Sequence, residues 1–149
     1  MSNTIKILVV DDDEKIIETL SLALEEEGFS VDTAKTGKEA IVKTFENFYN
    51  IAIVDWRLPD IEGTKLLGKL NETTPKMAKL MLTGYPSMDN AIDAVNNSAD
   101  AFLVKPVHFE NLLAKVKELL KKQEQEKEFS EDKMTNYLKT RVKMLTKSS

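Results

Sequence analysis

Five short apolar segments alternate along this chain with stretches of helical spacing, and this alternation limits its possible folds more than any other feature. The apolar segments cover residues 5–10, 29–34, 51–54, 77–82 and 101–104. Apolar residues recur at helical spacing around residues 16–28, 39–48, 64–71 and 87–97, and again from residue 109 onward. Strands that are joined by helices run parallel, and those helices bury both faces of the sheet. The sequence therefore predicts an α/β fold with a doubly wound, five-stranded parallel sheet.

Four of the five apolar segments end at side chains that can take part in chemistry. These are Asp11, Asp12 and Asp13 after the first segment, Asp55 after the third, Thr83 after the fourth and Lys105 after the fifth. In open parallel sheets the ligand site lies beyond the carboxyl ends of the strands. We therefore expect these side chains to share one site, although Asp13 could equally be a negative charge at the start of a helix.

The grouped carboxylates and the lysine suit phosphoryl transfer. Carboxylates at one edge repel one another unless a cation compensates them, and Mg²⁺ prefers oxygen ligands and often binds one or two carboxylates together with phosphate. The Lys105 ammonium could neutralise a phosphoryl group, and the Thr83 hydroxyl could donate to one of its oxygens. Asp55 is the carboxylate left to act as nucleophile. Phosphoryl transfer depends mainly on positioning and charge stabilisation, which such a set supplies.

Five motifs, in order and at the family's spacing, resemble the receiver domains of two-component signalling. They lie at residues 8–13, 53–55, 58–63, 82–85 and 102–106 and read LVVDDD, IVD, LPDIEG, LTGY and FLVKP. The resemblance covers roughly residues 4–120 and implies the flavodoxin-like strand order 2-1-3-4-5. It implies a cytoplasmic response regulator that accepts a phosphoryl group from a histidine kinase or phosphotransfer protein and signals through a partner or output surface. Such a protein is a regulatory phosphoacceptor and not an enzyme that acts on external substrates.

The resemblance also implies a metal site and a phosphoacceptor. Asp55 would accept the phosphoryl group and ligate Mg²⁺, Asp12 would ligate Mg²⁺ directly, and Asp11 would do so through water. The backbone carbonyl of Arg57 would complete the metal site. Three consecutive acids leave the frame ambiguous, and we choose Asp11 and Asp12 because the family's acidic pair directly follows its strand.

Three further residues would respond to the phosphoryl group. By the same resemblance, Lys105 would pair with Asp55 or its phosphoryl group, and Thr83 would bind a phosphoryl oxygen. Phe102 would be the aromatic residue that changes rotamer with Thr83.

Two other functions compete with this prediction. A small phosphatase or phosphotransferase of the haloacid-dehalogenase type also uses Mg²⁺ and an aspartate after a strand. That family has threonine or valine where this chain has Lys15. A scaffold that works without phosphorylation is the second alternative, and the complete set of site residues argues against it.

An acidic body carries a basic C-terminal part. Residues 1–107 hold 11 basic and 18 acidic residues, whereas residues 108–149 hold 10 basic and 7 acidic residues. The acidic body disfavours nucleic-acid binding, which depends on basic residues that neutralise phosphates. No apolar run is long enough to span a bilayer, so we expect no membrane segment.

The domain organisation follows from the pattern after residue 109. We predict a receiver domain over residues 1–122 and a helical C-terminal extension over residues 123–149. The stretch 121–128 has no apolar side chain that could pack on the body, so we expect it to be a solvated helix or a linker. Apolar residues then return in a second helix that Ser130 could cap. A short isolated helix is marginal in water, so we expect this helix to pair with a second copy, giving a homodimer, or to pack on the acidic body.

Overall fold

The computed structural model describes residues 4–73, 75–84 and 99–147. Its strands are β1 (Lys6–Val10), β2 (Ser30–Ala34), β3 (Ile51–Asp55), β4 (Ala78–Thr83) and β5 (Ala101–Val104). Its helices are α1 (Glu14–Glu26), α2 (Gly37–Glu46), α3 (Gly63–Leu67) and α5 (Phe109–Lys147). The helix that we expected over 87–97 lies outside the described residues. All neighbouring strands pair in parallel in the order β2-β1-β3-β4-β5, which confirms the predicted sheet.

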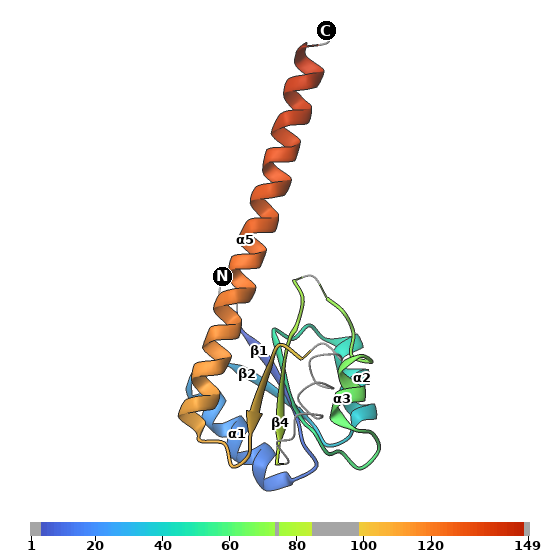
Figure 1. The fold of residues 1–149 in the computed structure, drawn as a ribbon, viewed down its shortest axis with the longest axis vertical. Coiled ribbons are helices and arrows are strands. Elements are labelled where there is room, and N and C mark those ends of the chain that lie inside the picture. Colours follow the sequence, from blue (N-terminus) through green and yellow to red (C-terminus); the bar gives the residue numbers. More distant parts are fainter. Residues whose placement is uncertain (1–3, 74, 85–98, 148–149) are drawn as a thin grey trace.

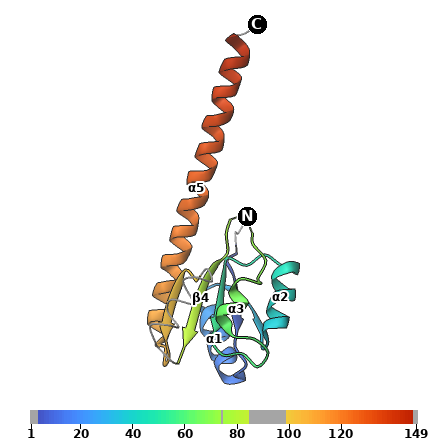
Figure 2. The same ribbon diagram turned by 45° about the vertical axis from the view of Figure 1, so that its right-hand side comes forward.

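Helices cover both faces of this sheet, which lies between them as a central layer (Figure 1; Figure 2). Side chains alternate along each strand, so β1 sends Ile7 and Val9 to one face and Leu8 and Val10 to the other. The first face packs against α1 and α5, and the second packs against α2 and α3. Burial on both faces explains why the central strands β1 and β3 read as continuous apolar runs, whereas the edge strand β2 alternates.

Helix α1 begins and ends where the local chemistry requires it. The Asp13 carboxylate caps its first turn by accepting hydrogen bonds from the backbone N–H groups of Lys15, at 2.9 Å, and Ile16, at 3.4 Å. Gly28, just past the last turn, has φ +96°, a conformation that glycine adopts at little cost. The capped start of α1 leaves Asp11 and Asp12 in the short connection between β1 and α1.

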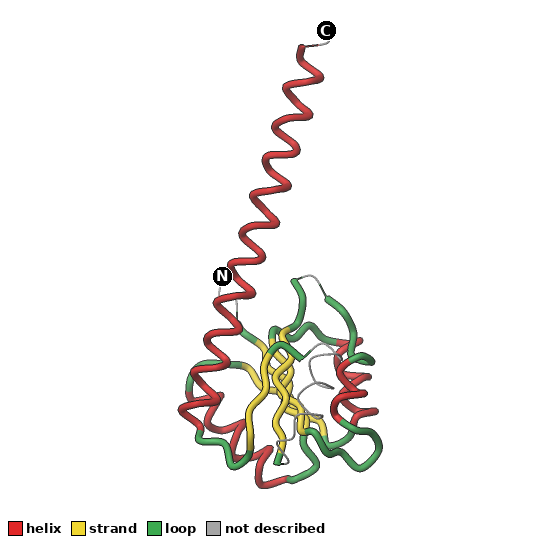
Figure 3. Tube along the Cα trace, in the orientation of Figure 1, coloured by secondary structure: helices red, strands yellow, loops and turns green. Residues whose placement is uncertain are grey.

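Helix α5 is one continuous helix of 39 residues and not two helices joined by a linker. Its first third packs on the sheet, and the rest projects away from the body (Figure 1; Figure 3). No helix in the described ranges combines the length and the apolar composition needed to cross a bilayer.

The expectation that residues 121–128 make no contact with the body is wrong at Gln123. This side chain is 8% exposed, and its Nε2 donates to the carbonyl oxygens of Asn50, at 3.0 Å, and Lys76, at 2.7 Å. Its Oε1 accepts from Asn50 Nδ2 at 3.2 Å. Gln123 therefore fastens α5 to the amino-terminal ends of β3 and β4.

Candidate functional site

The parallel sheet brings four of the predicted site residues to one edge. Asp55 and Thr83 are the last residues of β3 and β4, while Asp11 and Lys105 directly follow β1 and β5. The backbone N–H of Lys105 donates to the Thr83 carbonyl oxygen at 2.6 Å, which fixes β5 beside β4 at this edge. The carboxylates, the hydroxyl and the ammonium are thus contributed by neighbouring strands, as the sequence predicted.

Lys105 connects two buried carboxylates. Its Nζ lies 3.0 Å from Asp55 Oδ1 and 3.3 Å from Asp11 Oδ2. Asp11 and Asp55 are 2% and 8% exposed, whereas the Lys105 side chain is 26% exposed. Because the pairs are largely shielded from water, they interact more strongly than surface ion pairs do. The ammonium is therefore held between the Asp55 and Asp11 carboxylates.

Burial controls the titration of this cluster. Burial raises the pKa of Asp55, and the nearby charge of Asp12 adds to the rise, although Lys105 opposes it. Burial likewise raises the pKa of Asp11, and the charge of Asp55 adds to that rise. Burial alone would lower the pKa of Lys105, but its hydrogen bonds and attraction to the two carboxylates outweigh burial, so this pKa is raised. The site thus holds more negative charge than Lys105 neutralises.

The carboxylate groups of Asp11, Asp12 and Asp55 can hold a divalent cation. One oxygen from each residue lies within 4.8 Å of the others, so all three can approach the same ion. Asp12 is exposed, which leaves the cluster open to water on one side. An all-oxygen set of this kind, open to water on one side, fits Mg²⁺, whose charge would offset the carboxylate repulsion that adds to the effect of burial on these pKa values. Asp13 is instead turned to the first turn of α1, where it serves as the cap.

A tight loop follows β3 next to the carboxylate cluster. The Gly63 N–H donates to the Trp56 carbonyl oxygen at 2.7 Å, and Arg57 forms an antiparallel bridge with Glu62. A Cβ atom on Gly63 would lie 2.4 Å from the Asp55 carbonyl oxygen, so only glycine fits here without a backbone shift. This loop fixes the backbone on either side of Arg57, whose carbonyl we predicted to bind the metal.

Sequence reasoning quoted Asp60 only as part of a motif and missed its structural role. Its carboxylate accepts from the N–H groups of Gly37, at 2.9 Å, and Lys38, at 3.0 Å, at the start of α2. These hydrogen bonds lower the pKa of Asp60. Asp60 therefore ties the loop that follows Asp55 to the start of α2. An acid next to a turn proline, twenty-odd residues after a helix start, gives no local signal of this contact.

The two predicted switch residues differ in their surroundings. Thr83 is fully buried at the end of β4. Phe102, in the middle of β5, is half-buried and packs against the apolar cluster shared by the sheet, α2 and α3. Phe102 of β5 pairs with Met81 of β4, which lies two residues before Thr83. The two predicted switch residues therefore lie on adjacent, paired strands.

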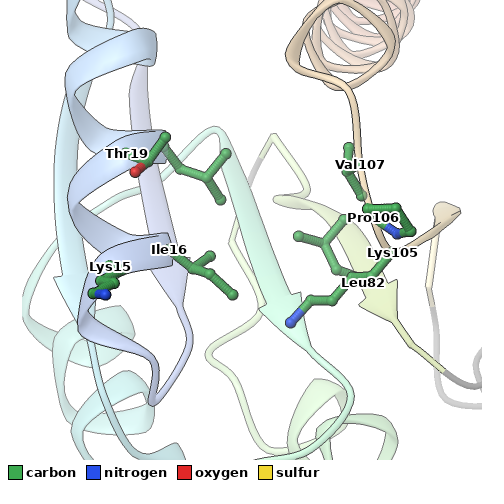
Figure 4. A pocket seen from close by; sticks show the side chains of 8 residues that line it. Lys15, Ile16, Thr19, Leu82, Lys105, Pro106 and Val107 are labelled. Carbon is green, nitrogen blue, oxygen red and sulfur yellow. The ribbon is translucent and has the colours of Figure 1, made fainter.

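An open, mainly apolar groove of about 580 Å³ lies beside Lys105. Figure 4 shows Ile16 and Thr19 of α1 on one wall and Leu82, Pro106 and Val107 on the other. Lys105 lines the groove and also contacts Asp55, so the groove and the carboxylate cluster share this side chain.

The family model of the response regulator receiver domain matches residues 7–117. Among solved structures, the chain is similar to a receiver domain protein (CheY-like) from Methanospirillum hungatei JF-1, with 44% identity and a TM-score of 0.79 over 83% of this chain and 99% of that one. It is also similar to a Burkholderia pseudomallei response regulator solved with a phosphorylated aspartic acid, a calcium ion and citrate. That match has 32% identity and a TM-score of 0.67 over 74% of this chain and 65% of that one.

Curated relatives extend the same similarity. The chain is 31% identical over 122 residues to the response regulator ArlR of Staphylococcus saprophyticus. This match covers 80% of this chain and 54% of that protein. The chain spans about half the length of the curated relatives it matches.

Proposed function

This chain belongs to the response regulator receiver domain family, and we propose that Asp55 is its phosphoacceptor. Receiver domains of this family are phosphorylated on aspartate and act as regulatory phosphoacceptors, not as enzymes that turn over external substrates. The observation that carries the assignment is the position of Lys105 Nζ, 3.0 Å from Asp55 Oδ1 in a pocket that also holds Asp11 and Asp12. An ammonium at this point can neutralise a phosphoryl group as it reaches Asp55.

The phosphoryl donor that we propose is a phosphorylated histidine of a kinase or phosphotransfer protein. An Asp55 carboxylate oxygen forms the new bond to phosphorus, the phosphorus–nitrogen bond to the imidazole breaks, and the imidazole nitrogen takes up a proton. Mg²⁺ would be held directly by Asp12, Asp55 and the Arg57 carbonyl, and through water by Asp11. Its positive charge would stabilise the charge on the phosphoryl oxygens. Lys105 would move from the carboxylate to a phosphoryl oxygen.

We propose that the donor protein seats an apolar surface in the groove between α1 and the segment after β5. The lining residues Ile16, Leu82 and Val107 supply apolar contact beside Lys105 (Figure 4). A histidine side chain that extends from such a surface could reach Asp55 without displacing the strands.

Thr83 and Phe102 are proposed to carry the response. The Thr83 hydroxyl would donate to a phosphoryl oxygen on Asp55, and Phe102 would change rotamer with it. A coupling of roughly 1–3 kcal/mol is typical of such switches. Thr83→Ala should still take up phosphate but lose most of the NMR shift changes at Phe102.

The test of the acceptor is the mass of the full chain after incubation with acetyl phosphate and Mg²⁺. Wild type should gain one base-labile phosphoryl group, and Asp55→Asn should gain none. Asp132→Asn, which removes an exposed carboxylate on the projecting part of α5, is the matched control and should label like wild type. Label that persists in Asp55→Asn and disappears in Asp11→Asn would instead support the haloacid-dehalogenase type of chemistry.

The metal assignment has a separate test. Trp56 follows the acceptor residue, so its fluorescence should report Mg²⁺ binding. Asp12→Ala should weaken binding strongly, whereas Asp13→Ala should change helix stability by about 1 kcal/mol through its lost cap and leave metal affinity nearly unchanged. The reverse order of effects would shift the metal-binding pair by one residue.

We also propose that the receiver domain, whose end we predicted at residue 122, extends through Gln123, that the helix after it is a separable extension, and that two copies associate through this extension. The extension exposes large apolar side chains, including Met134, Tyr137, Leu138 and Val142. Gln123, by its contacts, is the last residue that serves the body. Light scattering should give the mass of a dimer for the full chain and of a monomer after truncation at Gln125.

A further inference from the structure

The projecting part of α5 divides its charge into two blocks. Residues 124–132 contain five acids and one lysine, whereas residues 133–146 contain four basic residues and no acid. All of these side chains are exposed, and the two blocks follow one another along a single helix. The projecting helix is therefore negative beside the body and positive toward its far end.

One face of the same segment is apolar. Met134, Leu138 and Val142 are spaced four residues apart on consecutive turns, and they are 59%, 54% and 59% exposed. Met134 lies three turns beyond Gln123, so this stripe continues the face with which α5 packs on the body. Covering such an apolar stripe with another helix removes it from water and lowers the free energy.

We propose that two copies of this chain pair their projecting helices antiparallel, with the two-fold axis near residue 136. This inference rests on the self-association proposed above and specifies its geometry. In this arrangement Met134 of one copy meets Leu138 of the other at the centre. The acidic block of each helix, over 126–132, then lies against the basic residues of the other helix, over 140–146.

Charge decides the orientation. A parallel pair would place each block against its own copy, acid on acid and base on base, whereas the antiparallel pair opposes unlike charges at both ends. Exposed ion pairs add little to affinity individually, but like-charge repulsion along a whole interface is an effective way to exclude one orientation.

The body leaves space for the end of the second helix. A groove of about 630 Å³ lies between the loop before β4 and the start of the projecting segment. Its lining includes Pro75 and Lys76 of that loop and Glu126, Ser130 and Met134 of the helix. With the axis near residue 136, residues 142–146 of the second copy lie opposite 126–130, which is at this groove. Val142 and its neighbours would fill it.

Spin labels on the full chain test the orientation, and the absence of native cysteine allows single labels. A label at Thr135→Cys, which flanks the stripe and faces position 137 of the other copy, should lie roughly 10 Å from its copy in the dimer. A label at Glu128→Cys should lie roughly 25 Å from its copy, because position 128 faces position 144, sixteen residues along the helix. Short distances at both positions would establish a parallel pair, and long distances at both would place the dimer contact elsewhere; either result overturns the proposal.

Salt provides an independent readout. Raising NaCl from about 50 to about 500 mM shortens the screening length from roughly 14 to 4 Å. The dimer dissociation constant should then rise several-fold if unlike charges face each other, and it should fall if like charges do. A monomer at all protein concentrations would refute the self-association itself, whereas a dimer that tightens with salt would refute only the antiparallel geometry.

Discussion

Replacing Gln123 with alanine should destabilise the receiver domain by about 2–3 kcal/mol. The side chain is buried and makes three hydrogen bonds, two as donor to the Asn50 and Lys76 carbonyl oxygens and one as acceptor from Asn50 Nδ2. Each such bond contributes about 0.5–1.5 kcal/mol net, and its loss leaves a buried partner unsatisfied. Alanine is the better helix former, which offsets only a few tenths of a kcal/mol.

Thermal unfolding of a chain truncated after Glu128 is the appropriate assay, because it removes the apolar stripe proposed to associate and keeps position 125 within the helix. At roughly 3 °C per kcal/mol for a domain of this size, the Tm should fall by roughly 6–9 °C. Gln125→Ala in the same chain is the matched control, since it makes the same change two residues away on an exposed site. Its effect should stay within about 0.5 kcal/mol. Equal Tm values for the two variants would refute the reasoning that Gln123 fastens α5 to the sheet.

Three further predictions concern the site. Burial raises the folded-state pKa of Asp55, so its negative charge lowers the stability of the fold at neutral pH. Without metal, Asp55→Asn should therefore unfold at a higher temperature than wild type at pH 7. This difference in Tm should disappear as the pH falls through the raised pKa toward 3.8. Gly63→Ala should cost about 2 kcal/mol or more in denaturant unfolding, because its Cβ would meet the Asp55 carbonyl oxygen, whereas Gly84→Ala, with open space around it, should cost less than about 1 kcal/mol. Ile16→Lys should slow phosphotransfer from a kinase at least tenfold and leave labelling by acetyl phosphate unchanged, while Leu22→Lys, on an exposed part of the same helix, should alter neither.

The cluster at the carboxyl edge was predictable because the sheet is parallel. Once five parallel strands are joined by helices, all strand ends that carry Asp11, Asp55, Thr83 and Lys105 must lie on one edge. The contact between Lys105 and both carboxylates follows from that topology with little freedom left. The separate fate of Asp13 did not follow, because a third acid can serve equally as a ligand or as a helix cap until the start of α1 is fixed.

Hydrophobic periodicity and the polar residues that interrupt it determined the fold class, the strand order through the family resemblance, and the members of the site. These features are local in the chain, and a sequence displays them directly. The role of Gln123 was decided only by the tertiary structure. It lies in a polar run that is typical of a solvated helix, yet its partners Asn50 and Lys76 are 73 and 47 residues away. The continuity of α5 has the same origin. Helix formation is cooperative and needs a stable start, so the polar middle of α5 would not be helical in isolation. The packing of its first turns on the sheet and the hydrogen bonds of Gln123 provide that start.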